Sequence, residues 1–154
     1  KNNLLLVTWA DCIPVLLFES KKLIVAAIHS GWRGTKSKIV TKTIKNILDM
    51  GGDIKNIYAA VGPGIKDCCY KVGREVISYF NTDEYRDFIK EKNSNFYLDL
   101  QGVVYKELIL AGIDKEKIDC YKNCNSCDKE IGFFSCRRDG KDNFEGQAAF
   151  IGIF

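Results

Sequence analysis

The residues best able to do chemistry in this chain gather around its only histidine. His29 ends an apolar segment and opens the loop His29-Ser30-Gly31-Trp32-Arg33-Gly34. Gly31 and Gly34 permit a tight backbone that other groups can approach closely. An imidazole near neutral pH serves as a metal ligand or a general base. We therefore predict an active centre at His29, the plainer alternative being a buried histidine bonded to a backbone carbonyl.

A cysteine and an aspartate precede the neighbouring strand, in the motif Asp11-Cys12-Ile13-Pro14. A hairpin that turns near residues 19–22 would bring Cys12 and His29 to the same end of a sheet. A thiol beside an imidazole can ligate zinc, or it can act as a nucleophile with the histidine as its base. Asp11 could orient a ligand or move a proton. The alternatives are that Asp11 caps a turn and that Cys12 packs in the core.

Arginine is rare and unevenly placed among the 23 basic residues. Three of the five arginines, Arg33, Arg137 and Arg138, fall in two short loops. A guanidinium grips phosphate or carboxylate through two parallel hydrogen bonds, and a glycine-rich loop before a helix is a ready anion site. Unless this grouping is chance, we predict that the three arginines bind phosphate. Ser135 is either a further substrate contact or an ordinary strand residue.

A second group of cysteines lies toward the end of the chain, at Cys120, Cys124, Cys127 and Cys136. Cys124-Asn125-Ser126-Cys127 has the spacing of a metal-binding knuckle, but no second pair repeats that spacing. Free thiols are the preferred interpretation of this group, and a structural zinc site is the alternative. Residues 62–64 and 68–70 are interpreted as a pocket wall, because glycine and proline punctuate turns.

Hydrophobic periodicity predicts which elements position these residues. We expect strands at 4–8, 14–20, 22–29, 57–62, 117–121, 132–136 and 147–154, and helices at 36–50, 73–80, 83–91 and 98–111. Strands and helices are mixed without a strict βαβ alternation. The pattern therefore predicts an α+β fold, a layered α/β sandwich with a mixed sheet.

Length and composition favour one globular domain over residues 1–154. The chain has 154 residues, of which 46% are hydrophobic, and a net charge of +3. That charge is too small to argue for nucleic acid, and no apolar run reaches the 18 residues that a membrane span needs. Seven cysteines, an odd number without a signal peptide, indicate a reducing compartment, so we expect a cytoplasmic protein. The chain starts at Lys1 and enters a strand at once, so we expect it to lack an N-terminal segment.

Four motifs, in this order, resemble the YfiH family, also called the multicopper polyphenol oxidase or laccase-like family. They span nearly the whole chain, and together they are specific. Members of that family are mostly described as purine nucleoside phosphorylases with adenosine deaminase and methylthioadenosine phosphorylase activity. The motifs are Thr8-Trp9-Ala10-Asp11-Cys12-Ile13-Pro14-Val15-Leu16, the His29 loop, Gly62-Pro63-Gly64-Ile65-Lys66-Asp67-Cys68-Cys69-Tyr70-Lys71-Val72-Gly73 and Phe133-Phe134-Ser135-Cys136-Arg137-Arg138-Asp139-Gly140.

The resemblance implies a zinc site whose first two ligands fall on Cys12 and His29. The family's third ligand is a histidine in a Gln-x-His-Gly motif well before them, which this sequence does not contain. We interpret this as removal of an N-terminal part rather than decay of the site. The implied partners are a purine nucleoside and phosphate, with neither nucleic acid nor membrane.

Other functions stay open at this point. Cys12 and His29 could form a metal-free cysteine hydrolase. A copper-dependent polyphenol oxidase is a weaker interpretation, because copper oxidases need many histidines. A non-catalytic domain could bind polyanions through the lysine-rich face of the 36–50 helix, although such a face is more often merely solvated.

Overall fold

A four-stranded mixed sheet forms the centre of the computed structural model, which describes residues 2–128, 130–140 and 145–154. The strand order is β3-β2-β4-β8. β2 runs antiparallel to both β3 and β4, whereas β4 and β8 are parallel. The sheet is therefore mixed, as predicted. Its strands are β2 (Ile13–Glu19), β3 (Ile24–Ser30), β4 (Ile57–Val61) and β8 (Ile118–Cys120).

Two helices, α2 (Ile39–Asp49) and α4 (Leu100–Leu110), lie along one face of this sheet. α2 buries Val40, Ile44 and Ile47, a stripe at helical spacing. α4 is apolar over more of its circumference and buries residues on several sides. Both helices contribute to the main hydrophobic core, which lies between them and the sheet.

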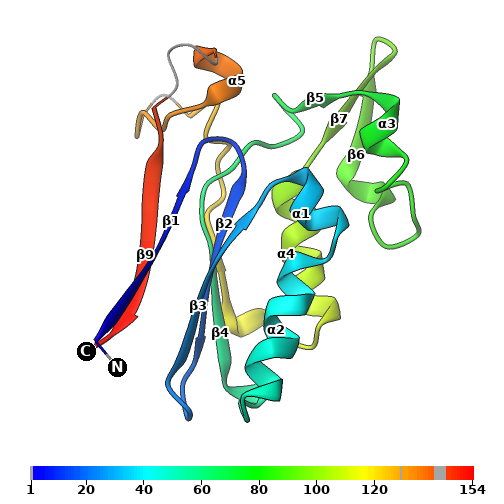
Figure 1. The fold of residues 1–154 in the computed structure, drawn as a ribbon. Helices are drawn as coiled ribbons and strands as arrows, with labels where there is room; N and C mark the ends of the chain where they lie inside the picture. The colour runs from blue at the N-terminus through cyan, green and yellow to red at the C-terminus, as the bar shows by residue number, and fades with distance from the viewer. Residues whose placement is uncertain (1, 129, 141–144) are drawn as a thin grey trace.

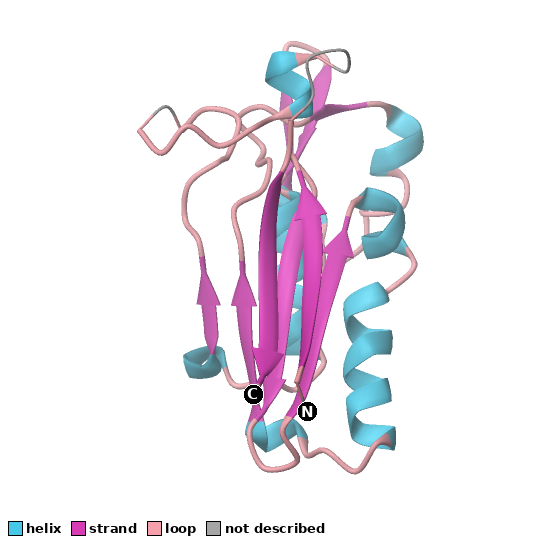
Figure 2. Cartoon of the chain, turned by 60° about the vertical axis from the view of Figure 1, so that its left-hand side comes forward, coloured by secondary structure: helices cyan, strands magenta, loops and turns pink. Residues whose placement is uncertain are grey.

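A two-stranded antiparallel ribbon lies on the opposite face of the sheet and comprises β1 (Asn3–Trp9) and β9 (Gln147–Ile153). Figure 2 shows the strands of the two sheets running nearly alongside each other. Val7 and Trp9 of β1 are buried, whereas Leu4 and Leu6 are exposed. The ribbon, the sheet and the helices make three layers, so the predicted layered α/β sandwich is confirmed.

A small third sheet, in the order β5-β7-β6, extends beyond the helices. It comprises β5 (Lys71–Val72), β6 (Ile89–Lys92) and β7 (Asn95–Leu98), with α3 (Arg74–Ile77) beside it. The predicted helix at 83–91 is wrong, because a 3-10 turn, η2 (Arg86–Phe88), leads directly into β6. Asn93 and Ser94 both have positive φ, 48° and 59°, which suits the two-residue turn of a hairpin. The predicted helix at 73–80 shrinks to the four residues of α3.

The predicted helix at 36–50 corresponds to α2, and a separate short helix, α1 (Trp32–Lys36), precedes it. Lys38 breaks the helix with a left-handed backbone at φ 59°. Its ammonium lies 3.2 Å from the Glu107 carboxylate of α4, which is buried, and contacts the Tyr85 hydroxyl. Burial raises the pKa of Glu107, and Lys38 opposes that rise. The break therefore lets Lys38 fasten the start of α2 to α4.

The predicted strand at 132–136 is also wrong. Cys136 begins a short helix, α5 (Cys136–Asp139), and Ser135 caps it by accepting a hydrogen bond from the Arg138 amide. Two further 3-10 helices are η1 (Ile54–Asn56) and η3 (Lys115–Lys117). α2 and α4 have 11 residues each, about half of what a bilayer requires, and none of the described helices could span a membrane.

Candidate active site

Cys12 and His29 lie at the same end of the central sheet, where β2 begins and β3 ends. In the β2–β3 ladder Pro14 pairs with His29 and Ile13 with Ser30, so Cys12 comes to lie opposite Gly31. A Cβ built on Gly31 would lie 2.8 Å from the Cys12 Sγ and 3.9 Å from the His29 Nε2. The two donor atoms thus converge on one point that only glycine leaves open. The hairpin brings together the two residues that the sequence paired.

The imidazole of His29 is oriented by a single hydrogen bond. Its Nδ1 lies 2.8 Å from the carbonyl oxygen of Thr8 on β1. A carbonyl can only accept, so Nδ1 carries the proton and Nε2 presents a lone pair. A histidine that binds a metal through one ring nitrogen is usually held by a hydrogen bond from the other ring nitrogen to an acceptor such as a carbonyl. His29 is solvent-exposed, so a ligand can reach Nε2.

The Cys12 thiol is half-buried beside acidic groups. Burial raises its pKa, and Asp11 and Cys136 raise it further. A thiol with a raised pKa is mostly protonated at neutral pH and is a weak nucleophile. Sulfur and imidazole nitrogen are the donors that zinc prefers. The residues present therefore fit two positions of a zinc site better than they fit a metal-free thiolate nucleophile.

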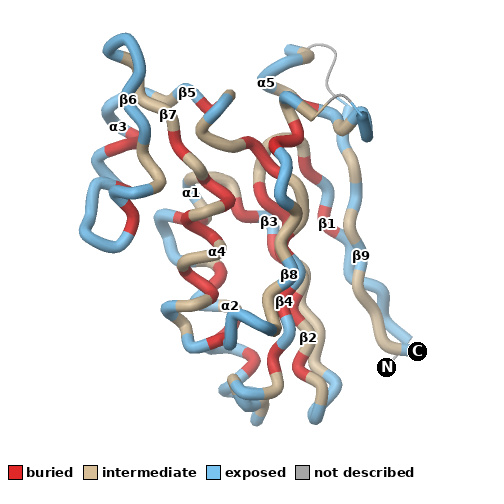
Figure 3. The backbone as a smooth tube through the Cα atoms, turned by 180° about the vertical axis from the view of Figure 1, so that it is seen from behind, coloured by how far each residue is buried: buried red, intermediate tan, exposed pale blue. Residues whose placement is uncertain are grey.

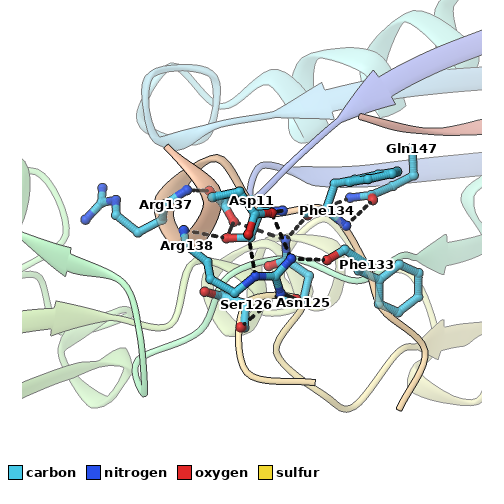
Figure 4. Close-up of polar contacts among 10 residues, drawn as sticks. Asp11, Asn125, Ser126, Phe133, Phe134, Arg137, Arg138 and Gln147 are labelled. Carbon is cyan, nitrogen blue, oxygen red and sulfur yellow. Dashed lines mark hydrogen bonds and ion pairs between the residues drawn. The ribbon is translucent and has the colours of Figure 1, made fainter. Parts of the chain in front are cut away.

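Asp11, next to Cys12 in the chain, holds two later segments (Figure 4). Its carboxylate accepts hydrogen bonds from the Asn125 Nδ2 at 3.0 Å, the Ser135 Oγ at 2.6 Å and the Arg137 amide at 2.7 Å. Its backbone has a positive φ of 77°, which aspartate tolerates better than most residues. The structure therefore places Asp11 as a clamp next to Cys12.

Arg138 and Ser135 belong to the same clamp, which we define as Asp11, Asn125, Ser135 and Arg138. Ser135 is buried, and its hydroxyl lies between Asp11 and the Arg138 amide. All five guanidinium donors of Arg138 have acceptors: the carboxylate of Asp139 and the carbonyls of residues 125, 126 and 133. The predicted phosphate contact at Arg138 therefore has no donor left for a ligand.

Among the described residues, Arg33 and Arg137 keep guanidinium donors without an acceptor. Arg33 is exposed on α1, with its guanidinium 4.4 Å from the centre of the Trp32 ring. Arg137 is also exposed and donates one hydrogen bond, at 2.6 Å, to the carbonyl of Lys71. The positive charges of both guanidinium groups lie near Tyr70 and oppose the rise in the pKa of its phenol. These two arginines are the cations that the structure leaves available near Cys12.

Tyr70 is a residue whose role the sequence did not reveal beyond a pocket wall. Burial raises its pKa to about 12, an effect that Arg137 opposes and that Cys12 and Asp11 strengthen. The phenol therefore keeps its proton at neutral pH and can donate a hydrogen bond. Its position among both arginines and Cys12 depends on the tertiary fold.

A cavity of about 620 Å³ opens between the β1–β9 ribbon and the central sheet. Residues directly opposite in a ladder share a face, so Pro14, which lines the cavity, lies on the same face as His29. Trp9 lines it as well, and among the described residues the buried Trp9 Nε1 has no acceptor. A cavity of 300–1,000 Å³ is typical of small-molecule sites.

The later cysteines group differently from the prediction. The sulfur atoms of Cys68, Cys69, Cys124 and Cys127 all lie within 4.8 Å of one another and could hold a metal ion. Cys120 and Cys136, which the sequence grouped with Cys124 and Cys127, lie elsewhere. The Cys120 thiol donates to the carbonyl of Tyr121, and Cys136 lies near Cys12, whose pKa it raises. We refer to the first four residues as the tetracysteine cluster.

Similar proteins have been named and solved. The chain is 40% identical over 144 residues to a purine nucleoside phosphorylase of Clostridium acetobutylicum, a match that covers 91% of this chain and 58% of that protein. It is 32% identical over 152 residues to an adenosine deaminase from an unknown prokaryotic organism, over 96% of this chain and 56% of that protein. The chain thus spans somewhat more than half the length of these relatives.

Solved structures share the fold. The hypothetical protein YfiH of Bacillus licheniformis superposes with a TM-score of 0.90 at 29% identity, over 98% of this chain and 58% of that one. YlmD of Geobacillus stearothermophilus gives a TM-score of 0.88 at 31% identity, over 97% and 56%. The family model described as multi-copper polyphenol oxidoreductase laccase matches residues 1–153. The chain therefore belongs to that family, the YfiH family which its four motifs resemble.

Proposed function

We propose that this chain carries part of a zinc-dependent purine nucleoside phosphorylase that also has adenosine deaminase and methylthioadenosine phosphorylase activity. The observation that carries the proposal is the convergence of the Cys12 Sγ and the His29 Nε2 beside Gly31, with the histidine proton fixed on Nδ1. Curated relatives are named purine nucleoside phosphorylase and adenosine deaminase. The substrates proposed for the whole protein are a purine nucleoside and phosphate.

Cys12 and His29 would hold the zinc ion, and a third donor would come from a segment that precedes Lys1. Two observations support such a segment: the relatives are longer than this chain, and the outer faces of β1 and β9 expose Leu4, Leu6 and Phe150. A zinc ion with an open coordination position lowers the pKa of bound water to about 7, the chemistry that deamination needs. In this arrangement residues 1–154 form a single domain that the preceding segment completes.

The protein's own residues would bind and orient the substrates. Arg33 and Arg137 would grip phosphate, since both are exposed and keep free donors. Tyr70, protonated at neutral pH, would donate a hydrogen bond to a substrate oxygen or ring nitrogen. The cavity that Trp9 lines has the volume for a purine nucleoside. Asp11 would act by positioning Cys12, with Ser135 and Arg138 supporting it.

A second candidate function is copper-dependent oxidation of polyphenols, because the matching family model carries that description. A metal-free cysteine hydrolase is less well supported, because burial raises the pKa of Cys12. We place the protein in the cytoplasm. All seven cysteines lie in the described part of the chain and are free thiols, which is typical of a reducing compartment.

The test is to express the protein with any sequence that its gene encodes upstream of Lys1, and to load it separately with zinc and with copper. We expect the zinc form to convert inosine and phosphate to hypoxanthine and ribose 1-phosphate, and to deaminate adenosine. Activity on a polyphenol only, and only with copper, would contradict the proposal. So would phosphorolysis that survives complete removal of metal.

A further inference from the structure

The tetracysteine cluster joins two loops that continue adjacent strands of the central sheet. Cys68 and Cys69 follow β4, and Cys124 and Cys127 follow β8. Backbone bonds already pair these loops: the Asn125 amide donates to the carbonyl of Gly64, and the Tyr121 amide to that of Val61. A parallel bridge between Gly64 and Cys124 extends the β4–β8 ladder. The four sulfur atoms meet where this extended ladder ends.

The distances within the cluster suit one ion better than paired disulfides. The Cys127 Sγ lies 3.1 Å from the Cys68 Sγ and 3.0 Å from the Cys69 Sγ. A sulfur atom can form only one disulfide, so Cys127 cannot bond both neighbours. All four sulfur atoms lie within 4.8 Å of one another. In a tetrahedral zinc site with Zn–S bonds of about 2.3 Å, neighbouring sulfur atoms are roughly 3.8 Å apart, so small side-chain shifts suffice.

The cluster is buried at Cys124 and reaches solvent at Cys68 and Cys127. Cys124 is buried and belongs to the hydrophobic core. Cys68 and Cys127 are exposed and border a surface depression of about 520 Å³, so an ion can enter from solvent.

We propose a second zinc site, structural rather than catalytic, whose ligands are Cys68, Cys69, Cys124 and Cys127. Four thiolates close the coordination shell, as in structural zinc sites, and leave no position for substrate. Each thiol gives up its proton to solvent when the ion binds, with no redox step. None of its four ligands belongs to the Cys12–His29 pair, and zinc binding here does not require the proposed activity.

This zinc ion would support the clamp beside the candidate active site. Asn125 directly follows Cys124, is fully buried and donates to the Asp11 carboxylate. Tyr70 directly follows Cys69 and is buried near Cys12. A fixed tetracysteine cluster therefore holds Asp11 and Tyr70 from two sides, and its loss should loosen both.

The experiment measures zinc per chain in purified protein whose Cys12–His29 site has been removed by the double change Cys12→Ser and His29→Ala. We expect one zinc ion to remain, and to be lost when Cys69→Ser and Cys127→Ser are added. The matched control is Cys120→Ser, a half-buried thiol outside the cluster, which should keep the ion. Cobalt loading should give the intense sulfur-to-metal charge-transfer spectrum of four thiolate ligands.

If the variants of the cluster fail to fold, the cobalt spectrum of the protein that carries only Cys12→Ser and His29→Ala still decides. No bound metal in that protein, or a spectrum with fewer sulfur ligands, would overturn the proposal. An intact mass showing a disulfide between two of the four cysteines would overturn it as well. Phosphorolysis by the wild-type protein is measured separately, so the failure of one proposal is distinguishable from that of the other.

Discussion

Two neighbouring regions at the end of the central sheet use polar residues in opposite ways. In the clamp of Asp11, Asn125, Ser135 and Arg138, the Asp11 carboxylate and every donor of Arg138 have partners within the protein. At the same end of the sheet, His29 presents its Nε2 to solvent, and Arg33 and Arg137 are exposed. Satisfied groups hold structure, and unsatisfied exposed groups are free to meet a ligand.

Residues adjacent in the chain belong to different regions of these two. The Asp11 carboxylate holds the clamp, whereas Cys12 faces His29. Every guanidinium donor of Arg138 has an acceptor, whereas the Arg137 guanidinium makes one hydrogen bond to the described residues. Neither the residue type nor the motif separates the members of each pair; the hydrogen bonds do. Variants of the Cys12–His29 site should therefore lose bound metal and turnover. Variants of the clamp should instead lose stability.

The largest effect is expected at the two donor atoms. His29→Ala and Cys12→Ser should each lower kcat/KM for inosine phosphorolysis by at least about 100-fold. Loss of a group that merely hydrogen-bonds to a metal ligand already costs about 10–100-fold. His29 is exposed, so the free energy of unfolding of His29→Ala should stay close to wild type. The measurements are steady-state kinetics and urea unfolding. Full turnover by both variants would remove them from the active site.

Removal of the clamp carboxylate should mainly cost stability. Asp11→Ala leaves Ser135 and Asn125 without their shared acceptor, and we expect the free energy of unfolding to fall by about 3 kcal/mol. Asp119→Ala, at an exposed carboxylate on β8, is the control and should change it by less than about 0.5 kcal/mol. Chemical denaturation measures both. If Asp11→Ala kept its stability but lost turnover, Asp11 would have a chemical role.

The adjacent arginines should separate ligand binding from folding. Arg137→Ala should raise the KM for phosphate roughly 10- to 150-fold, since a charge-assisted hydrogen bond contributes about 1.5–3 kcal/mol. Arg138→Ala should instead remove the guanidinium donors of three backbone carbonyls and of the Asp139 carboxylate and lower the thermal midpoint. Phosphate titrations at saturating inosine, with thermal unfolding of both variants, test this. A phosphate KM raised only in Arg138→Ala would reverse the assignment.

The ion pair of Lys38 with Glu107 should give the smallest effect, visible only as a pH dependence. Burial raises the folded pKa of Glu107, so the folded state holds that proton more tightly than the unfolded state. Its contribution to stability is present below the ordinary pKa of about 4.3 and is lost as pH rises through the folded pKa. Relative to Glu107→Gln, the wild type should become less stable as pH rises from about 4.

A pH series of urea unfolding on the wild type and Glu107→Gln measures this. The half-buried carboxyl of Asp99, whose pKa burial also raises, is common to both proteins and cancels in the difference. A difference in stability that does not vary across the acidic range would show that Glu107 titrates at the same pH folded and unfolded.

Local signals predicted the central part of the fold and the pairing of Cys12 with His29. The turn at residues 19–22 fixes the register of one hairpin, and that register alone brings the two residues together. The tetracysteine cluster could not be found in this way, because it depends on the parallel pairing of β4 with β8 across more than 50 residues. The knuckle at Cys124 was visible in the sequence, but its partners were not.

Helix prediction failed where apolar spacing was compatible with two structures. Tyr85, Phe88 and Ile89 recur at helical spacing, but a 3-10 turn and a hairpin strand bury the same side chains. The role of Arg138 was missed for a related reason. A guanidinium suits backbone carbonyls as well as it suits phosphate, and only the folded loop decides between them.

Zinc stoichiometry together with activity tests the central claim most directly. The wild-type protein, expressed with any upstream sequence and purified without chelator, should bind one more zinc ion than its His29→Ala variant. That additional ion should be needed for phosphorolysis of inosine. Equal zinc content in the two proteins, with equal turnover, would contradict the assignment of Cys12 and His29 as the metal-binding centre.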